Sequence, residues 1–406
     1  MLPMWGRGVE LPPLVNYQSY VSEGYQKNSV VYSCIRKVAT TAPAALLAVE
    51  RVKDGQREFV NDHALLHTFQ NPNPHTSAFT FQELIHTFLN IIGEAYVIKV
   101  GFGGRVGRPV KPGEFYLARP DLMHPVPGEK KLMGFVYRGV DGKRTPFTPD
   151  EVIHIKYPNP NDQWEGLGRG LAPLSAAAME TDVDNRMMVL IKDFFENGAT
   201  VAGILKIKHA ITDPDEITRI HNRLKQQYTG DKKWYDMILD ADAEYQRLGL
   251  NFDEMALPQL RSLTESRICA VFDVPALLVG VQVGLKNEAG FTSALPEARK
   301  ALWMDKIIPD NQRIGEALTM GLADQLQENE FITHDYRHIQ ILQENRNEKF
   351  VRAVNAWVND LRTMNESRLE IGDPKRDDGD VLYSEYKKQF APLPAPPATI
   401  PKVGEA

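Results

Sequence analysis

The sequence predicts an α+β fold built in several parts, and three observations predict it. The first 170 residues mix helical patterns with a block of strand patterns, and a long helical pattern follows at about 172–197. A small β-α-β insertion at 199–250 then separates that helix from a second one. At 406 residues, with 43% apolar and 25% charged residues, the chain has the composition of a globular protein of two or three domains.

The charge and the cysteines limit the function. The net charge is −6, whereas a protein whose main task is to grip nucleic acid needs clustered Lys and Arg. A protein that only lets nucleic acid pass is compatible with this charge. Cys34 and Cys269 lie in apolar helical patterns without CxxC spacing, which predicts buried free thiols in a reducing compartment. With no signal region and no apolar stretch of roughly 18 residues, we expect a soluble protein made inside the cell.

The first 100 residues predict an arm, a helix, a strand and a helix pair. Residues 1–28 are rich in Pro, Gly and Tyr without a period, which predicts a loosely held arm. A helix from Ser29 ends at Pro43, and residues 44–52 read as a strand. A helix pair follows, broken by the prolines of 71–74, and we expect its second helix to begin at Thr80 with a capping box to Glu83.

A strand-rich block and the long helix come next. The predicted strands, with a hairpin turn at Asp141-Gly142, are 95–100, 115–120, 134–147 and 152–157. The long helix has Pro173 in its first turn and Gly198 as its stop, and would measure roughly 40 Å. Its middle is polar on all sides and its second half has an apolar face, which indicates packing against several neighbours.

The last part of the chain is mainly helical. After the β-α-β insertion, the predicted elements are a helix at about 253–272, a helix at 293–327 interrupted at Pro296 and Pro309, a strand at 331–342 and helices at 347–361 and 365–371. The final 16 residues form a Pro/Ala tail that we expect to be disordered.

Motifs for catalysis are few. The glycine run at 101–107 fails the GxGxxG spacing and reads as a hairpin turn, and neither GxxxxGK[ST] nor GxSxG occurs. Two histidine pairs have metal-ligand spacing, His63 with His67 on a helix and His334 with His338 on a strand. Neither pair has the Glu of HExxH or an obvious third ligand, so ordinary surface histidines are the simpler interpretation.

One loop needs a special explanation. Residues 272–293 lie between two helices, yet they contain three glycines and a single basic residue, Lys286. A surface loop is usually more polar than this, and a core strand would not contain so many glycines.

The order of these elements, with five local motifs, resembles the portal proteins of tailed double-stranded-DNA bacteriophages, in the siphovirus-type branch. The motifs lie at 31–44, 63–100, 151–178, 194–205 and 266–280. The resemblance covers about 30–330, and no single motif carries it; the five do so by occurring in the right order.

The resemblance implies a division of the chain. It gives an N-terminal arm at 1–28, an α+β wing at 29–171, stem helix 1 at 172–198, a clip at 199–250, stem helix 2 at 251–273, a tunnel loop at 274–292, a kinked helix and wing strand at 293–343, a helical crown at 344–390 and a Pro-rich tail at 391–406.

The resemblance also implies a function. Portal proteins form a ring, usually a dodecamer, at one capsid vertex, through which DNA is packaged and ejected. The implied partners are further copies of the chain, the terminase large subunit, head–tail adaptor proteins, the major capsid or scaffold protein, and double-stranded DNA passing without sequence specificity. The implied location is the virion portal vertex, and the host cytoplasm during assembly, with no membrane, cofactor or catalysis.

Two sets of site residues follow from the resemblance. The tunnel loop would present Gln282, Gly284, Lys286, Asn287 and Glu288 to DNA, and the clip would dock partners through Lys232, Lys233, Trp234 and Tyr235. A loop with one Lys and one Glu can touch the duplex and release it, whereas many Arg contacts would hold each phosphate. Twelve chains would carry a charge of about −72, which repels DNA overall.

Alternatives remain open at this point. The loop could be buried between subunits without meeting DNA, and the aromatics at 234–235 could fold back on the insertion. The whole chain could instead be a head-completion or tail adaptor ring protein, or a metal-dependent enzyme that uses one of the histidine pairs.

Overall fold

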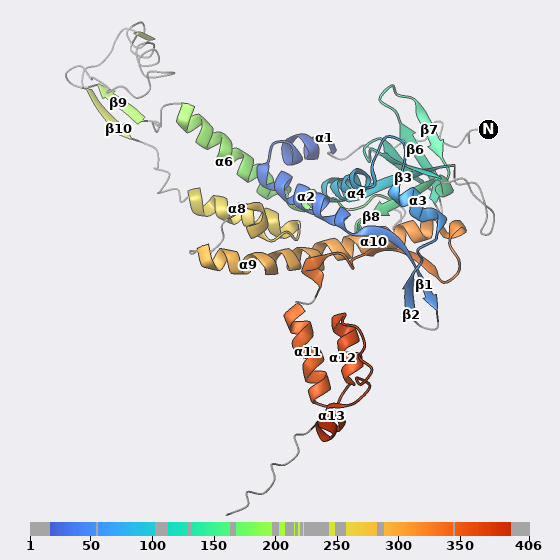
Figure 1. The fold of residues 1–406 in the computed structure, drawn as a ribbon. Helices are drawn as coiled ribbons and strands as arrows, with labels where there is room; N and C mark the ends of the chain where they lie inside the picture. Colours follow the sequence, from blue (N-terminus) through green and yellow to red (C-terminus); the bar gives the residue numbers. More distant parts are fainter. Residues whose placement is uncertain are drawn as a thin grey trace, which may run out of the picture. The chain divides into compact units, whose positions relative to one another are not determined.

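The computed structural model describes residues 17–53, 56–101, 113–128, 132–162, 168–196, 203–207, 215, 218–219, 222, 243–247, 257–281, 288–343 and 346–390. The chain divides into two compact units, Met1–Ile339 and Gln340–Ala406, which are described separately (Figure 1). Among the described residues, no helix is long and apolar enough to cross a membrane. The mixed helix and sheet content confirms the predicted α+β class.

Three antiparallel sheets are built mainly from the first 156 residues, with one strand, β11, from much later in the chain. The first has the order β11-β1-β2, with β1 (Leu46–Lys53), β2 (Gln56–Phe59) and β11 (Glu330–Asp335). The second has the order β4-β3-β8, with β3 (Glu94–Val100), β4 (Glu114–Ala118) and β8 (Val152–Lys156). The third has the order β5-β6-β7, with β5 (Met123–Pro127), β6 (Leu132–Arg138) and β7 (Arg144–Phe147). The hairpin expected at Asp141-Gly142 joins β6 to β7, and Gly142 has φ 77°.

Helices pack on these sheets. They are α2 (Ser29–Thr41), α3 (Ala64–Gln70), α4 (Ala78–Ile92) and α10 (Ile308–Gly321). The helix α4 begins at Ala78, two residues earlier than expected, because the Ser77 side chain caps it by accepting a hydrogen bond from the Thr80 backbone N–H at 3.2 Å. The expected capping box at Thr80 and Glu83 is therefore wrong.

The core lies where α10 meets two of the sheets. A Cβ added at Gly315 would lie 2.6 Å from the Ile332 carbonyl oxygen of β11, and one at Gly321 would lie 2.6 Å from the Ile153 side chain of β8. These two glycines therefore allow α10 to approach both sheets closely. The buried apolar side chains at this contact include Val49, Ile85, Leu89, Val97, Ile155 and Leu318. We call the three sheets together with α3, α4 and α10 the strand block.

The N-terminal segment is packed from residue 17 onward; of the loosely held arm expected for 1–28, residues 1–16 lie outside the described residues. The short helix α1 (Tyr17–Ser19) leads into a π-helical turn, Tyr20–Tyr25, which contacts α2, α4 and the later helices α5 and α6. A Cβ on Gly24 would lie 2.8 Å from the Leu174 side chain, and Asn28 is buried. The sequence hid this packing because the contacts depend on residues about 150 positions away.

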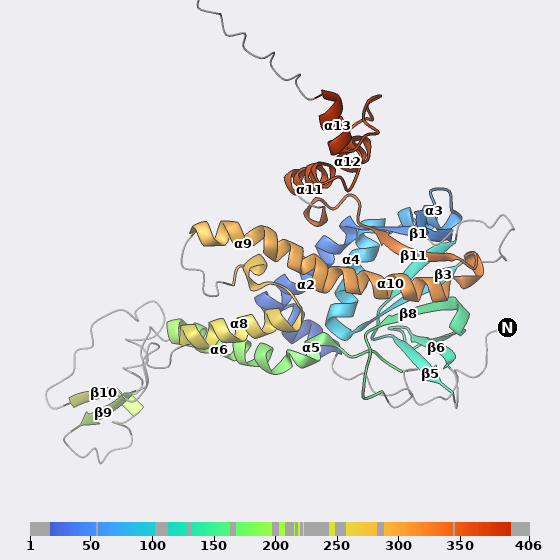
Figure 2. The same ribbon diagram turned by 90° about the horizontal axis from the view of Figure 1, so that it is seen from below.

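Two helices project from the strand block and lie side by side in both views (Figures 1 and 2). They are α6 (Ala178–Glu196) and α8 (Leu257–Val271), and we call them the stem pair. The predicted long helix is divided at Ala177, since α5 (Pro173–Ala176) precedes α6; Pro173 occupies the first turn as expected. Of the insertion, β9 (Gly203–Ile207) and β10 (Ala243–Arg247) pair in antiparallel fashion.

The helix that precedes α10 differs from the prediction at Pro296. The helix α9 (Glu288–Ala301) includes Pro296 in its interior, and a π-turn at Leu302–Ile307 connects it to α10. The break expected at Pro296 is wrong, since helix-favouring Ala and Leu precede it and Glu and Ala follow it. Pro309 lies in the first turn of α10, where its missing N–H costs nothing.

The described part of the C-terminal unit contains a 3₁₀ turn at Gln340–Leu342 and three α-helices. They are α11 (Arg346–Val358), α12 (Met364–Ile371) and α13 (Tyr383–Phe390). The first two were expected and α13 was not. Trp357 of α11 packs its ring edge-on against Tyr383 and Tyr386 of α13, at centroid distances of 5.0 and 5.5 Å. These aromatic contacts fasten α13 to α11 within this unit.

Candidate functional site: the junction between the strand block and the stem pair

The segment that leaves the strand block for the stem pair passes very close to the backbone of β3. A Cβ on Gly93 would lie 2.1 Å from the Leu171 carbonyl oxygen, and one on Gly170 would lie 2.2 Å from the Gly93 carbonyl oxygen. Gly93 also has φ +82°, which favours glycine over other residues. Two glycines are thus required for this crossing.

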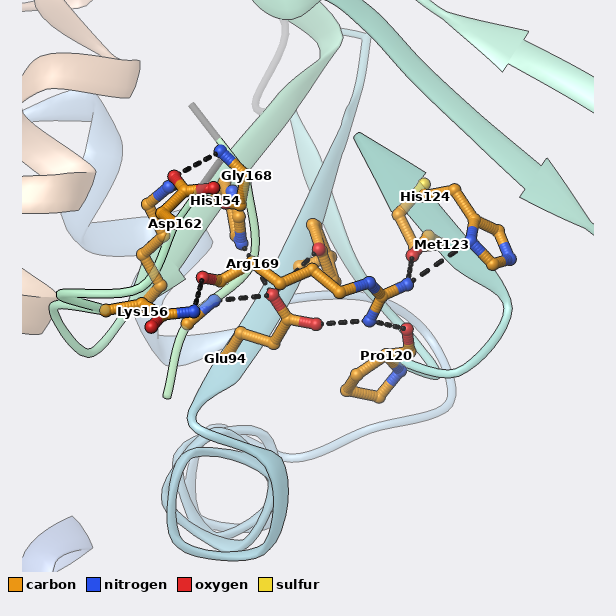
Figure 3. A network of polar contacts seen from close by, with 12 residues as sticks. Glu94, Pro120, Met123, His124, His154, Lys156, Asp162, Gly168 and Arg169 are labelled. Carbon is orange, nitrogen blue, oxygen red and sulfur yellow. Dashed lines mark hydrogen bonds and ion pairs between the residues drawn. The ribbon is translucent and has the colours of Figure 1, made fainter. Parts of the chain in front are cut away.

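Arg169 fastens this crossing to two sheets (Figure 3). Its guanidinium forms an ion pair with Glu94 of β3. The same group donates hydrogen bonds to the carbonyl oxygens of Met123 (2.6 Å) and Pro120 (3.2 Å), and its Nη2 lies 3.3 Å from Nδ1 of His124. The planar fork of Arg suits this arrangement of several acceptors. The network joins the second sheet, the third sheet and the chain entering α5.

Glu94 is the buried centre of the network, with a side chain that is 0% exposed. Besides Arg169, it accepts hydrogen bonds from the Tyr96 hydroxyl (3.0 Å), His154 Nε2 (3.1 Å) and the Gly170 N–H (3.2 Å). Burial by itself would raise the pKa of Glu94, but these hydrogen bonds and the Arg169 charge together hold that pKa below its ordinary value. Burial lowers the pKa of His154, so its neutral ring donates to the carboxylate.

A second polar contact holds α6 against α2. The Asn28 side-chain oxygen caps α2 by accepting hydrogen bonds from the N–H groups of Val30 and Val31, each at 3.0 Å. Its side-chain nitrogen donates to Asp184 of α6 at 2.8 Å and to Asn185 at 3.1 Å. Asn28 therefore caps the N-terminus of α2 and also binds α6.

The stem pair leaves several large apolar side chains exposed, although Met187 of α6 and Ile268 of α8 are buried. On α6, Thr181 and Asp184 are 5% and 2% exposed, whereas Met179 is 77% exposed and Leu190 is 43% exposed. A helix of a lone globular protein normally turns its apolar side inward. The large exposed apolar residues of the stem pair are Met179, Val183, Met188, Val189, Leu190, Leu260 and Leu263.

Most of the predicted site residues lie outside the described residues. This holds for Lys232, Lys233, Trp234 and Tyr235 of the expected clip, and for Gln282, Gly284, Lys286 and Asn287 of the expected tunnel loop. Glu288, expected in the loop, is instead the first residue of α9, so 288–292 are helical. An acidic residue at a helix N-terminus is favoured by the helix dipole, which explains this earlier start.

The described beginning of the expected loop is structured. Residues Ala276–Val279 form one 3₁₀ turn, which Gly280 ends with φ 81°. This turn contacts α2, α8 and α9. The expected tunnel loop therefore starts from a packed base.

The histidine pairs do not have the arrangement expected of metal ligands. His63 precedes α3 and caps it, with Nδ1 accepting from the Leu65 N–H at 3.2 Å, whereas His67 is exposed on the helix. His334 is buried in β11, which ends at Asp335, so the exposed His338 does not share its strand. The expected common faces are wrong in both cases, and among the described residues no group of three or more His, Cys, Asp or Glu could hold a metal ion.

Comparison with known proteins decides the family. A family model described as phage portal protein matches residues 29–372. This chain belongs to the phage portal protein family. The resemblance expected from the sequence is confirmed, and the portal family consists of structural rather than catalytic proteins. The match across 29–372 also favours a portal protein over a separate adaptor protein.

The related proteins are distant in sequence. An uncharacterized protein of Rickettsia bellii (strain RML369-C) is 26% identical over 369 residues, covering 89% of this chain and 90% of the relative. The portal protein of Enterobacteria phage HK97 is 26% identical over 259 residues, covering 62% of this chain and 57% of the relative.

Solved structures share the portal fold. A chain from the neck of an empty gene transfer agent particle has a TM-score of 0.66 at 22% identity, covering 90% of this chain and 96% of that one. An HK97-family phage portal protein from Corynebacterium diphtheriae has a TM-score of 0.54 at 14% identity, covering 79% of this chain and 96% of that one.

Three residues of the junction were missed by the sequence analysis. Each had a weak local signal: Asn28 directly precedes a helical pattern, Glu94 is an acid inside an apolar strand, and Arg169 lies in a glycine-rich segment. The sequence could not show that Glu94 and Arg169 meet, because 75 residues separate them.

Proposed function

We propose that this chain is the subunit of a portal ring that forms a DNA channel at one vertex of a virus-like particle. The observation that carries the proposal is the set of exposed large apolar side chains on the stem pair, among them Met179, Val183 and Leu190. Exposed apolar side chains gathered on two neighbouring helices favour an interface with another protein. The portal family membership indicates that the other protein is a further copy of this chain.

The number of subunits follows by analogy with the structural neighbours. One of them is the neck of a native gene transfer agent particle computed with C12 symmetry. A dodecamer is therefore the ring that we propose, located in the virion and assembled in the host cytoplasm. The major capsid or scaffold protein would surround it.

The loop that follows the structured turn Ala276–Val279 is proposed to face DNA in the channel. Its base is held by α2, α8 and α9, which supports a fixed position at the end of the stem pair. Its sequence has the single basic residue Lys286, so it can contact a passing duplex without retaining each phosphate.

The insertion at 199–250 is proposed to dock the terminase large subunit and later the head–tail adaptors. Lys232 and Lys233 beside Trp234 and Tyr235 combine charge with aromatic anchors, as protein interfaces often do. A K232E/K233E variant should form rings but bind the terminase more weakly in a pull-down. If the variant captures the terminase as well as the unmodified chain does, these four residues are not the docking site.

Ring formation is tested by native mass spectrometry with negative-stain electron microscopy. We expect rings of about twelve subunits for the unmodified chain, by the symmetry of the neighbour named above. A V183E/L190E variant places charges on the exposed apolar side of α6 and should abolish rings without unfolding the subunit, because both residues are more than one-third exposed.

The matched control is V140E, in which an apolar residue is also replaced by Glu. Val140 is 88% exposed in the turn between β6 and β7, far in sequence from the stem pair. It should assemble like the unmodified chain. Rings of V183E/L190E, or loss of rings in V140E, would contradict the proposed interface; a chain that stays monomeric even with capsid and scaffold proteins would contradict the ring itself.

A further inference from the structure

The two cysteines of the chain meet between α2 and α8. They are 235 residues apart in sequence, yet Cys34 Sγ and Cys269 Sγ are separated by 3.8 Å. Both side chains are buried. The sequence predicted two buried free thiols but gave no sign that they form a pair. A disulfide has an Sγ–Sγ distance of about 2.05 Å, so the two sulfurs must approach by less than 2 Å to form one.

The two thiols are chemically unequal. The Cys34 thiol donates its hydrogen bond to the Cys269 sulfur. This hydrogen bond, followed by burial, raises the pKa of Cys34, and the same hydrogen bond lowers the pKa of Cys269. Cys269 is therefore the thiol that ionises first, and the thiolate is the reactive form of cysteine.

We propose that Cys34 and Cys269 are an oxidisable dithiol, and that a small-molecule disulfide such as oxidised glutathione converts them into an intrachain disulfide that locks α8 to α2. The Cys269 thiolate attacks one sulfur of the reagent and expels one glutathione thiolate. Cys34 then loses its proton to water and attacks Cys269 Sγ, which expels the second glutathione thiol. Two protein thiols are oxidised, and one reagent disulfide is reduced to two thiols.

Access to Cys269 is provided by the end of α8. The Val274 N–H bonds to the Cys269 carbonyl at 3.0 Å, and the Asp273 N–H bonds to the Ala270 carbonyl at 3.2 Å, which together form a Schellman cap. The left-handed position of this cap is normally glycine, but here it is Asp273, with φ 53°.

The hydrogen bond in the last turn of α8 is also long. The Phe272 N–H lies 3.4 Å from the Ile268 carbonyl oxygen. A helix end with a strained cap and a weak last bond opens locally more readily than a helix centre. The proposal requires that this opening move the buried Phe272 and so expose Cys269.

The consequence for the particle rests on the proposed function. In a reducing cytoplasm the pair stays as thiols while subunits assemble. After the particle leaves the cell, the oxidising surroundings close the bond and fix a stem helix to α2 at the base of the proposed tunnel loop.

The test uses the purified full-length chain. It is incubated with oxidised glutathione, quenched with an alkylating reagent, digested without reductant and mapped by mass spectrometry. We expect a linked peptide containing Cys34 and Cys269, and a rise in Tm of at least about 5 °C that a reductant reverses. The C34A and C269A variants should show a glutathione adduct at most and no rise.

Two outcomes would overturn the inference. One is full alkylation of both thiols after prolonged oxidation, and the other is glutathione adducts on both cysteines without a linked peptide. If a cysteine variant fails to fold, the test depends only on the unmodified chain: the linked peptide must form on oxidation and disappear again when a reductant is added. The oxidation does not need a ring, so the two proposals can fail separately. If rings form but no linked peptide is found, only the disulfide inference is contradicted. If the linked peptide is found in a chain that never forms rings, only the proposed function is contradicted.

Discussion

The strand block and the stem pair differ in where their large apolar side chains lie. The strand block encloses an apolar core, and its buried carboxylate Glu94 is paired with Arg169 and accepts three further hydrogen bonds. The stem pair buries Thr181 and Asp184 and exposes large apolar side chains. The strand block thus buries its apolar core within one subunit, whereas the stem pair leaves apolar side chains that we propose are covered by other copies of the chain.

The difference has a physical cause. A buried charge is tolerated only where its hydrogen bonds are complete, which requires a rigid surrounding such as the sheets around Glu94. An exposed apolar side chain contributes to stability only when another surface covers it and removes it from water. Substitutions should therefore destabilise the monomer in the strand block and disturb assembly in the stem pair.

The largest effect is expected from R169A. It leaves Glu94 buried without its cation, and breaking a buried ion pair in this way costs about 3–5 kcal/mol in the free energy of unfolding. Urea unfolding measures it. The matched control is R186A in the stem pair, where the Arg186–Asp182 pair is exposed and should contribute less than about 0.5 kcal/mol. Equal losses for the two variants would contradict the contrast between the regions.

A large pH effect is expected from the buried histidines of the strand block. Burial lowers the pKa of His86 to about 4 and of His334 to about 3, compared with 6.5 for an ordinary His. Between pH 6.5 and 4 the unfolded chain therefore binds more protons than the folded one. The free energy of unfolding is then at its full value above pH 6.5 and decreases as the pH falls below it. We expect the free energy of unfolding to fall by about 2–4 kcal/mol between pH 7 and 5.

Urea unfolding at a series of pH values checks this decrease. The exposed His67 provides the control, because H67Q should leave the slope of stability against pH unchanged. The H334L variant should reduce the slope. A stability that stays constant from pH 7 to 5 would show that neither buried histidine titrates as described.

An intermediate effect is expected where the two regions join. N28A removes both the cap of α2 and the contact with Asp184, and should cost about 1–2 kcal/mol in the free energy of unfolding. N28D keeps the cap but places a carboxylate beside Asp184, so it should be no more stable than N28A. Recovery of full stability by N28D would mean that the cap alone matters.

The smallest effect on the monomer is expected from L190A in the stem pair. Leu190 is 43% exposed, so its truncation should change the free energy of unfolding by less than about 0.5 kcal/mol while weakening ring formation. The matched variant L318A removes the same atoms from the core of the strand block, where Leu318 is 1% exposed, and should cost about 2–5 kcal/mol. Thermal unfolding of the two variants at a concentration too low for rings gives the comparison directly.

Local signals allowed most of the fold to be predicted, and the errors occurred where a distant contact decides. The strand patterns and the turn at Gly142 were predicted because periodicity and turn residues act locally. Pro296 was expected to break a helix, yet α9 continues through it and gives way to a π-turn only at Leu302. The packing of residues 17–28 depends on Leu174 and Asp184, which no local pattern reveals.

By itself, the sequence determined the fold class, the order of the elements and the resemblance to portal proteins, because these depend on periodicity, spacing and motif order. Only the tertiary structure decided which groups meet: Arg169 with Glu94, Asn28 with Asp184, and Cys34 with Cys269. Each of these pairs is separated by at least 75 residues, and a contact across such a distance is set by the packing of whole elements. The outward apolar side of α6 was also a tertiary result, since periodicity shows that a face exists but not which way it points.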